Sequence, residues 1–401
     1  MTEGPFFSII LPTRNRPSLL ESAIQSVLLQ GFKDVELIIS DNSTNDDSQK
    51  IISKYSNDTR VQSFKPEREL NMLEHWEYAS KKARGKYIFI LTDRNVFVNN
   101  ALQLIHDSII QHENVNCFVI GIQSFNENSG TFKKKRDTSQ FVTLKTSDLL
   151  HNFLSTTWSI STKSKCIDYC YPKSLNSFIL NDLLKDFRNQ FGSYFDLPQI
   201  KTPDYSSFFI NCHVLNEVSY IGKTLLLRQG NEESNGGKVN KGDTSYLSSL
   251  NSTQLNVCDF MVNLPLVYNF VFNDYAIIHQ KLNSSIITDR SIIFNYYENL
   301  LFEIESKDKN VYETELLVSM KEIIFQQMRK QNFSEQQIIQ AVEKSVQRNI
   351  AFNKVYESFF INLDIHLKDF LSLRFKETSF VNKIIRFKYS SILQAAGFKE
   401  F

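Results

Sequence analysis

The chain has 401 residues, of which 42% are hydrophobic, so it is long enough for two folded units with a sizeable core. The 45 lysine and arginine residues nearly balance 44 aspartate and glutamate residues, and the formal charge of +1 excludes a strongly basic nucleic-acid-binding chain. The five cysteines lack C-x-x-C spacing, which argues against a disulfide framework and a zinc site. Neither a basic signal region nor a run of 18 apolar residues occurs, so we expect a cytoplasmic protein.

The first part of the chain alternates between apolar runs typical of strands and amphipathic runs typical of helices. Helices are predicted from Pro17 to Gly31, from about Leu70 to Gly85 and after Asn99. The first expected strand ends near Leu11. Further strands are expected at about 35–40, 61–64, 87–91 and 116–121. Because strands and helices alternate, the expected fold class is α/β, with a mostly parallel sheet flanked by helices.

Composition predicts a different architecture further along the chain. Residues 123–144 are polar and are expected to form a surface loop, and residues 231–285 to form a loop or flap and a connecting segment. From residue 286 apolar side chains recur at helical spacing, and Ser334 with Gln337 has the pattern of a capping box. We therefore expect an α/β domain over 1–230 and an all-helical C-terminal domain over 286–401.

Two of the predicted strands end in short polar segments. Pro12-Thr13-Arg14-Asn15 ends the first strand, and Asp41-Asn42-Ser43 follows the second. Ligands bind at the carboxyl edge of such sheets, and an acceptor such as Asp41 can receive the imide proton of a uracil or thymine ring. The sequence therefore predicts a nucleotide site at this edge.

The residues around these strand ends resemble a known family. The resemblance to family-2 glycosyltransferases with the GT-A fold rests on the run Phe7–Pro17 and, after it, on Ser26, Gln30, Glu36 and Asp41–Ser43. It extends over about residues 6–228 and implies a GT-A domain followed by helices. It also implies transfer of a sugar from a nucleotide-diphosphate sugar to a glycan or lipid-linked acceptor, with inversion, in the synthesis of a bacterial-type surface polysaccharide.

The same resemblance implies roles for individual side chains. Asp41 would bind the base of the donor, and Asp93 would hold its ribose. The full set of implied donor-binding residues is Pro12, Thr13, Asn15, Asp41, Arg68, Asp93 and Asn95.

The strand at 87–91 ends in Asp93-Arg94-Asn95, where the family carries an Asp-X-Asp motif that binds a divalent cation. Arg94 could itself contact the diphosphate, because a guanidinium is permanently charged and binds phosphate oxygens bidentately. The alternatives are a salt bridge between Arg94 and Asp93, or loss of activity. Asp93 is the only carboxylate of this motif, so Mg²⁺ or Mn²⁺ would find a poor site there.

Asp204 follows Pro203 at the start of a predicted helix. In similar glycosyltransferases a carboxylate after the acceptor segment takes the proton of the attacking hydroxyl, and this resemblance makes Asp204 the expected general base. The alternative is a plain helix cap, since a carboxylate is stabilised by the free amides of a helix N-terminus.

Residues 380–398 form an amphipathic pattern with Lys383, Arg386 and Lys388 on its polar side. Such a helix could lie on an anionic membrane near a lipid-linked acceptor, or dock on the helical domain of the same chain. A second function also stays open, that of a catalytically silent nucleotide-sugar-binding scaffold. No residue pattern specifies an oligomeric state.

Overall fold

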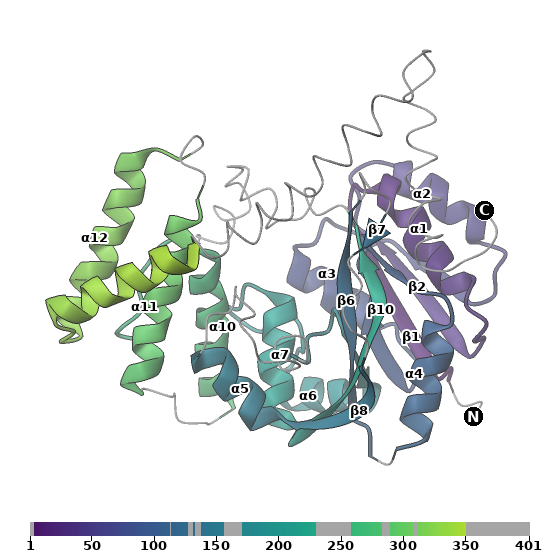
Figure 1. The fold of residues 1–401 in the computed structure, drawn as a ribbon. Helices are drawn as coiled ribbons and strands as arrows, with labels where there is room; N and C mark the ends of the chain where they lie inside the picture. The colour runs from purple at the N-terminus through teal and green to yellow at the C-terminus, as the bar shows by residue number, and fades with distance from the viewer. Residues whose placement is uncertain are drawn as a thin grey trace, which may run out of the picture. The chain divides into compact units, whose positions relative to one another are not determined.

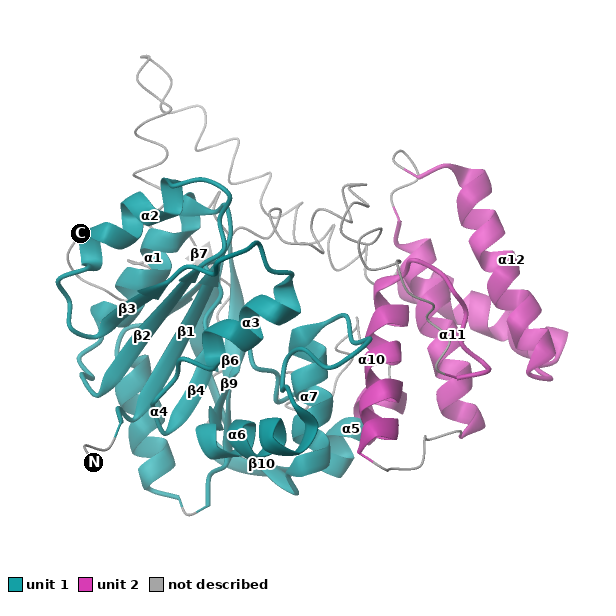
Figure 2. Cartoon of the chain, turned by 180° about the vertical axis from the view of Figure 1, so that it is seen from behind, with its two compact units in different colours: residues 1–150, 164–234, 386–401 teal, residues 151–163, 235–385 magenta. Residues whose placement is uncertain are grey.

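The structure is a computed structural model and describes residues 4–112, 114–126, 131–132, 138–155, 171–229, 258–282, 289–307 and 312–349. The chain divides into two compact units, shown in different colours in Figure 2. The first comprises residues 1–150, 164–234 and 386–401, and the second comprises residues 151–163 and 235–385.

The first unit is built on one mixed sheet. In the described residues the strand order is β3-β2-β1-β4-β9-β6-β10-β5, and β7 and β8 pair with β6 and β10. The strands are β1 (Phe7–Thr13), β2 (Val35–Asp41), β3 (Val61–Phe64), β4 (Tyr87–Ile90), β5 (Asn95–Phe97), β6 (Cys117–Asn126), β7 (Thr131–Phe132), β8 (Thr138–Lys145), β9 (Ser177–Leu180) and β10 (Glu217–Arg228). The first four strands are parallel to one another. The predicted α/β fold class is therefore confirmed.

Helices cover both faces of this sheet (Figure 1). They are α1 (Pro17–Leu28), α2 (Asp47–Ile52), α3 (Met72–Ser80), α4 (Ala101–Ile110), α6 (Asn181–Phe191) and α7 (Pro203–Val214). Helix α5 (Thr146–Ser155) begins in the first unit, and its residues from 151 onwards belong to the second. Leu20, Ile24 and Val27 of α1 pack with alternate residues of β1 and β2 in one buried cluster. This packing explains the pattern of the sequence, because apolar residues spaced by three and four positions share one face of a helix.

The surface loop predicted at 123–144 is wrong for the described residues, which are in strands, while residues 127–130 and 133–137 lie outside them. Strand β6 runs to Asn126, and β8 pairs antiparallel with β10 from Lys145 opposite Glu217 onwards. The partner of β8 lies more than 70 residues away in the sequence. Pairing with this distant strand stabilises β8, whereas the polar local sequence predicts a loop.

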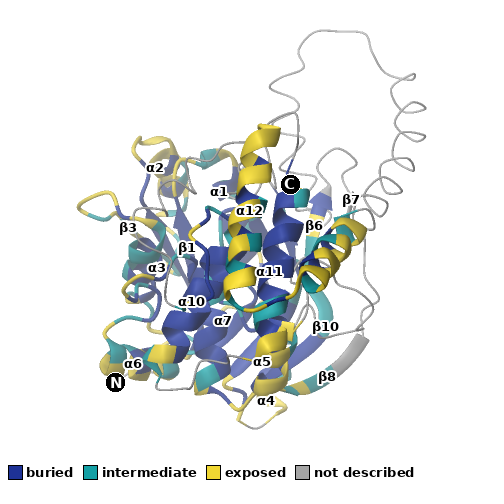
Figure 3. Cartoon of the chain, turned by 90° about the vertical axis from the view of Figure 1, so that its left-hand side faces the viewer, coloured by how far each residue is buried: buried dark blue, intermediate teal, exposed yellow. Residues whose placement is uncertain are grey.

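The second unit is helical in its described part, with α10 (Val267–Lys281), α11 (Arg290–Glu305), α12 (Thr314–Lys330) and a last helix at 335–349. Figure 3 shows α12 with an exposed outer face beside the more deeply buried α10 and α11. The capping box is present, since Ser334 N donates to Gln337 Oε1 at 3.0 Å and Gln337 N donates to Ser334 Oγ at 3.3 Å. Within the described ranges, no helix is long and apolar enough to cross a bilayer.

Helix α10 corrects the expectation of a loop and connecting segment over 231–285. Every residue from Tyr268 to His279 is buried, so this helix has no polar face and lacks the amphipathic period that marks a helix in sequence. The flap expected at 231–241 and the amphipathic segment at 380–398 lie outside the described residues.

Glu77 links α3 by hydrogen bonds to α6 and to the segment that follows α6. Its carboxylate accepts hydrogen bonds from Arg188 Nε at 2.8 Å, from Tyr194 N at 3.1 Å and from Phe195 N at 3.0 Å. Both charged side chains are buried, with exposed fractions of 11% for Arg188 and 6% for Glu77. The Glu77 carboxylate therefore pairs a buried charge and two main-chain amides at once.

We expect Glu77→Ala to lower the free energy of unfolding by about 3–5 kcal/mol, because it leaves a buried guanidinium without its partner. Chemical denaturation followed by circular dichroism measures the change. The control is Glu67→Ala, which removes an exposed carboxylate of the loop before α3. Equal stability of the two variants would contradict the anchoring role of Glu77.

Candidate active site

The site lies where β1 separates from β4. Strand β1 pairs with β2 along its whole length, to Thr13 opposite Asp41, but pairs with β4 only as far as Ile10. Pro12 lies beyond that last pair and has no N–H to extend the ladder. Because β2 and β4 lie on opposite sides of β1, this is a topological switch point, where α/β sheets form a ligand-binding crevice.

Asp41 has one oxygen that is satisfied and one that is not. Its residue exposure is 1%, and Ser43 N donates to Oδ1 at 3.0 Å. Within the part of the chain that is described, the buried Oδ2 has no hydrogen-bond partner. A buried carboxylate oxygen without a donor is costly, so this atom is the one that a ligand N–H would stabilise.

His75 lies near Asp41 without neutralising it. Burial lowers the pKa of His75 to about 4, even though the Asp41 charge acts to raise it. The ring is therefore neutral at pH 7, and its Nε2 lies 2.9 Å from Ser40 Oγ.

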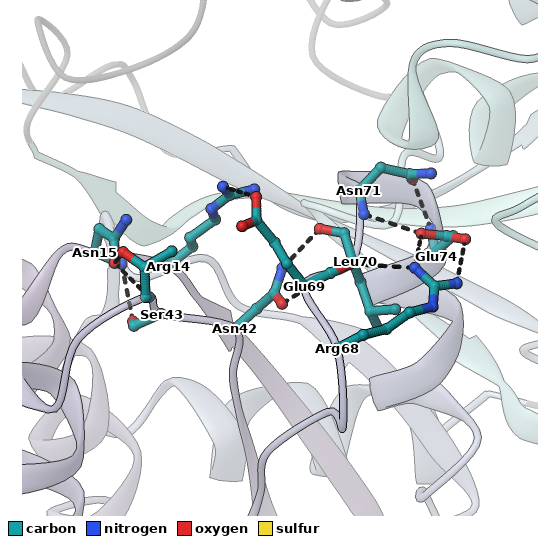
Figure 4. Close-up of polar contacts among 10 residues, drawn as sticks. Arg14, Asn15, Asn42, Ser43, Arg68, Glu69, Leu70, Asn71 and Glu74 are labelled. Carbon is teal, nitrogen blue, oxygen red and sulfur yellow. Dashed lines mark hydrogen bonds and ion pairs between the residues drawn. The ribbon is translucent and has the colours of Figure 1, made fainter.

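The loops after β1 and β2 are bound to each other (Figure 4). Asn15 adopts a left-handed φ of 54°, donates from its backbone N to Ser43 Oγ at 2.9 Å and accepts from Thr44 N at 3.0 Å. Asn42 bridges to the next loop, donating to Leu70 O at 2.8 Å and accepting from Leu70 N at 3.0 Å. These bonds hold the walls of the crevice in one arrangement.

Arg68 lies in the loop before α3 and is paired with a neighbouring carboxylate. Its guanidinium donates to both oxygens of Glu74, at 2.7 and 3.1 Å, and 66% of its side chain is exposed (Figure 4). Arg68 would have to exchange this ion pair before it contacted a nucleotide.

Asp93 follows β4, on the other side of the switch point. Only 2% of it is exposed, and it accepts from Thr13 Oγ1 at 3.1 Å and from Arg16 Nη1 at 3.3 Å. Burial raises the pKa of Asp93, opposed by the charge of Arg16, the bond from Thr13 and the charge of Arg94. Arg16 thus forms the ion pair with the Asp93 carboxylate. The charge of Arg94 also acts to lower the pKa of Asp93.

The donor set at Asp93 does not fit a divalent cation. Magnesium and manganese prefer about six oxygen ligands, whereas both oxygens of Asp93 already accept hydrogen bonds and two guanidinium groups act on them. In the described ranges, no group of three histidine, cysteine, aspartate or glutamate side chains could hold a metal ion. We therefore derive no chemical step through a metal.

Strand β10 brings further polar groups to the Asp93 segment. Asn95 of β5 is paired with Arg228, and Gln229 N donates to Arg94 O at 2.8 Å. Directly opposed residues of antiparallel strands point to the same face of a sheet. Asn95 Oδ1 and Arg228 Nε are both buried without a hydrogen-bond partner in the described structure, so this face offers an acceptor and a donor.

Asp204 belongs to a cluster with two cations. Burial lowers the pKa of Lys173 to about 8 and also lowers the pKa of Arg228, and in both cases the Asp204 charge opposes the shift. Lys173 Nζ lies 3.2 Å from the centre of the Tyr205 ring. Through Arg228, opposite Asn95, this cluster adjoins the Asp93–Asn95 segment.

Asp204 is not the N-cap of α7, but it lies in the first turn, where the helix dipole stabilises a carboxylate, so the structural alternative stands beside the role of general base. Thr202 is the N-cap of α7, Pro203 occupies the first helical position, and Asp204 falls in the first turn. Proline is favoured at that first position, which moves the cap one residue earlier. Ser207 Oγ donates to Asp204 O at 2.8 Å, so the start of the helix is fixed.

Sequence reasoning did not select three cations that the structure brings to these carboxylates, namely Arg16, Lys173 and Arg228. Lys173 and Arg228 are each separated from Asp204 by more than 20 residues, and no spacing pattern links them. The only local signal was Arg228, a charged residue at the end of the apolar run Leu225–Leu227.

The comparison with protein families agrees with this geometry. Residues 8–169 match the model of "Glycosyl transferase family 2", a stretch that includes Asp41, Asp93 and Arg94. This part of the chain is therefore similar to family-2 glycosyltransferase domains. The α/β unit has the GT-A fold that the sequence predicts, with a helical region after it.

Individual relatives of this chain match over shorter stretches. The GalNAc(5)-diNAcBac-PP-undecaprenol beta-1,3-glucosyltransferase of Campylobacter jejuni is 43% identical over 61 residues, 15% of this chain and 20% of that protein. The minor teichoic acid biosynthesis protein GgaA of Bacillus subtilis is 32% identical over 133 residues, 32% of this chain and 30% of that protein. The chain thus spans less than a third of the length of either relative.

Among solved structures, S. aureus TarS 1–349 in complex with UDP-GlcNAc is similar with a TM-score of 0.46 and 14% identity. That comparison covers 88% of this chain and 91% of the TarS chain.

Proposed function

We propose that the protein transfers a sugar from a nucleotide-diphosphate sugar to a glycan or lipid-linked acceptor, with inversion, in surface-polysaccharide synthesis. The observation that carries this proposal is the pair of buried carboxylates, Asp41 and Asp93, at the switch point of a family-2 domain. The names of the two curated relatives, one a glucosyltransferase and one a teichoic acid biosynthesis protein, support the acceptor class.

In this proposal each end of the crevice binds one part of the donor. Asp41 Oδ2 accepts the imide N–H of a uracil or thymine base, which supplies the partner that the atom lacks in the described structure. Asp93 and Asn95 contact the ribose. Arg94 and Arg228 stabilise the diphosphate, because fixed cations in a partly desolvated site are already oriented when negative charge develops.

Asp204 acts on the acceptor. Its carboxylate takes the proton of the attacking hydroxyl as the new bond forms between that oxygen and the anomeric carbon. The bond from the anomeric carbon to the diphosphate breaks in the same step, and its electron pair leaves with the nucleotide. Attack from the face opposite the leaving group inverts the configuration.

We also propose that the protein works at the cytoplasmic face of a membrane, in contact with anionic lipid through residues 380–398. The support is the amphipathic pattern of that segment and its three basic residues Lys383, Arg386 and Lys388.

The proposal is tested by incubating the full chain with UDP-, dTDP- and GDP-sugars and a polysaccharide or lipid-linked acceptor fraction. Release of nucleoside diphosphate that depends on the acceptor, together with a labelled glycan product, is the expected result. Nucleotide-sugar binding without release in every combination would favour the silent scaffold instead.

We expect Asp41→Asn to weaken nucleotide binding by roughly ten- to a hundredfold, the value of one hydrogen bond to a charged group. Ser43 N requires an acceptor at the Oδ1 position, so the amide would place its NH₂ where Oδ2 meets the base. Isothermal titration calorimetry measures the affinity, with Asp46→Asn in the same loop as the exposed control. Unchanged affinity in Asp41→Asn would remove Asp41 from the site.

A further inference from the structure

The helical unit carries a cleft that the proposed reaction does not use. It has a volume of about 530 Å³ and is lined by α11, by the helix at 335–349 and by Ser155 and Phe333. Its cationic side chains are Arg290, Lys344 and Arg348. Glu298 is the one carboxylate among the lining residues, all of which are described, so two positive charges are in excess.

The single carboxylate is shared between two of these cations. Glu298, with 3% of its side chain exposed, pairs with Arg348 and lies 3.7 Å from Lys344 Nζ. Arg348 Nη1 is buried and has no hydrogen-bond partner in the described structure. One buried donor of the cleft is therefore left for a group that the described chain does not supply.

Aromatic rings lie beside Arg290 and Lys344. The Arg290 guanidinium lies 4.4 Å from the centre of the Phe333 ring, and Lys344 Nζ lies 5.3 Å from that of Phe294. Stacking on a ring orients a cation without neutralising its charge. Arg290 thus keeps its attraction for an anion, and Lys344 shares with Arg348 a single carboxylate, that of Glu298.

We propose that this cleft binds a phosphate or carboxylate group of the saccharide acceptor. Arginine and lysine bind both anions, and guanidinium groups match their oxygen geometry bidentately. That the anion belongs to the acceptor rests on the proposed function, whereas anion binding itself rests on the excess charge and the unpartnered Arg348 Nη1.

Two substitutions with opposite expected effects test the proposal. Lys344→Gln removes a cation that is 46% exposed, and we expect affinity for an anionic polymer to fall roughly two- to fivefold. Glu298→Gln removes the competing carboxylate and releases Lys344 and Arg348, so affinity should rise by roughly the same factor. A cluster that serves only to hold the helices together would not change binding in opposite directions.

The assay measures binding of the full chain to polyglycerol phosphate, to polygalacturonate and to neutral dextran at low and high salt. We expect one or both anionic polymers to bind, more weakly at high salt, and dextran not to bind. Lys330→Gln, an exposed lysine outside the cleft, is the charge-matched control. Thermal unfolding shows whether Glu298→Gln is folded. If Glu298→Gln is unstable, Lys344→Gln still tests the proposal, because the Lys344 side chain is exposed.

Failure of polymer binding, or equal affinity in wild type, Lys344→Gln and Lys330→Gln, would overturn the proposed cleft. Nucleotide-sugar binding in the same preparation separates this outcome from failure of the proposed function. Asp41→Asn should lose nucleotide affinity while it retains anionic-polymer binding.

Discussion

We expect Asp204→Asn to lower kcat for sugar transfer by roughly 10²–10⁴, the contribution typical of a positioned general base. The amide keeps the size of the side chain but cannot accept the proton of the acceptor hydroxyl. The Asp204 charge partly offsets the effect of burial on the pKa values of Lys173 and Arg228. In Asp204→Asn these two cations lose a negative partner, so affinity for the anionic donor should stay the same or increase. The loss therefore appears in kcat, while binding of the donor is preserved.

Steady-state kinetics and calorimetric donor binding, measured on the same preparations, test this result. Asp182→Asn is the matched control, because Asp182 also lies in the first turn of a helix, α6, and is exposed. It should leave both kcat and donor affinity unchanged. If Asp204→Asn turned over at the wild-type rate, the base would have to be sought elsewhere in the crevice.

We expect Arg94→Ala to lower kcat by roughly 10²–10³, the scale of removing one preorganised electrostatic contact. The reason is the single carboxylate of the Asp93-Arg94-Asn95 segment, whose oxygens already accept from Thr13 and Arg16. In this proposal Arg94, in place of a metal ion, supplies the positive charge that stabilises the leaving diphosphate. Activity should therefore persist in EDTA. Arg94→Lys keeps the charge but loses the bidentate fork, so an intermediate rate is expected.

Rates with and without EDTA, for wild type and both Arg94 variants, decide between arginine and metal. Strict dependence on Mn²⁺ or Mg²⁺, abolished by EDTA and restored by the metal, would show that the role given to Arg94 is wrong. Thermal unfolding should change little in Arg94→Ala, because the side chain is only partly buried.

Local pattern was sufficient for the first four strands and the helices between them. The strands predicted at 35–40, 61–64 and 87–91 became β2, β3 and β4 almost without change of bounds. β2 and β4 are buried in the parallel sheet and are therefore mostly apolar, whereas β3 is a partly exposed edge strand with a weaker apolar pattern. The strand ends also predicted that Thr13 and Asp41 would lie together, because parallel strands deliver their carboxyl ends to one edge.

Only the tertiary structure decided the features that depend on distant partners. Strand β8 is polar in sequence and exists because β10 pairs with it, and α10 shows no amphipathic period because it is buried on all sides. The same holds for Arg16 at Asp93 and for Lys173 and Arg228 around Asp204. Periodicity in the sequence indicates which face a segment buries. Strand order and helix packing decide which charged side chains come together, and no local sequence pattern specifies them.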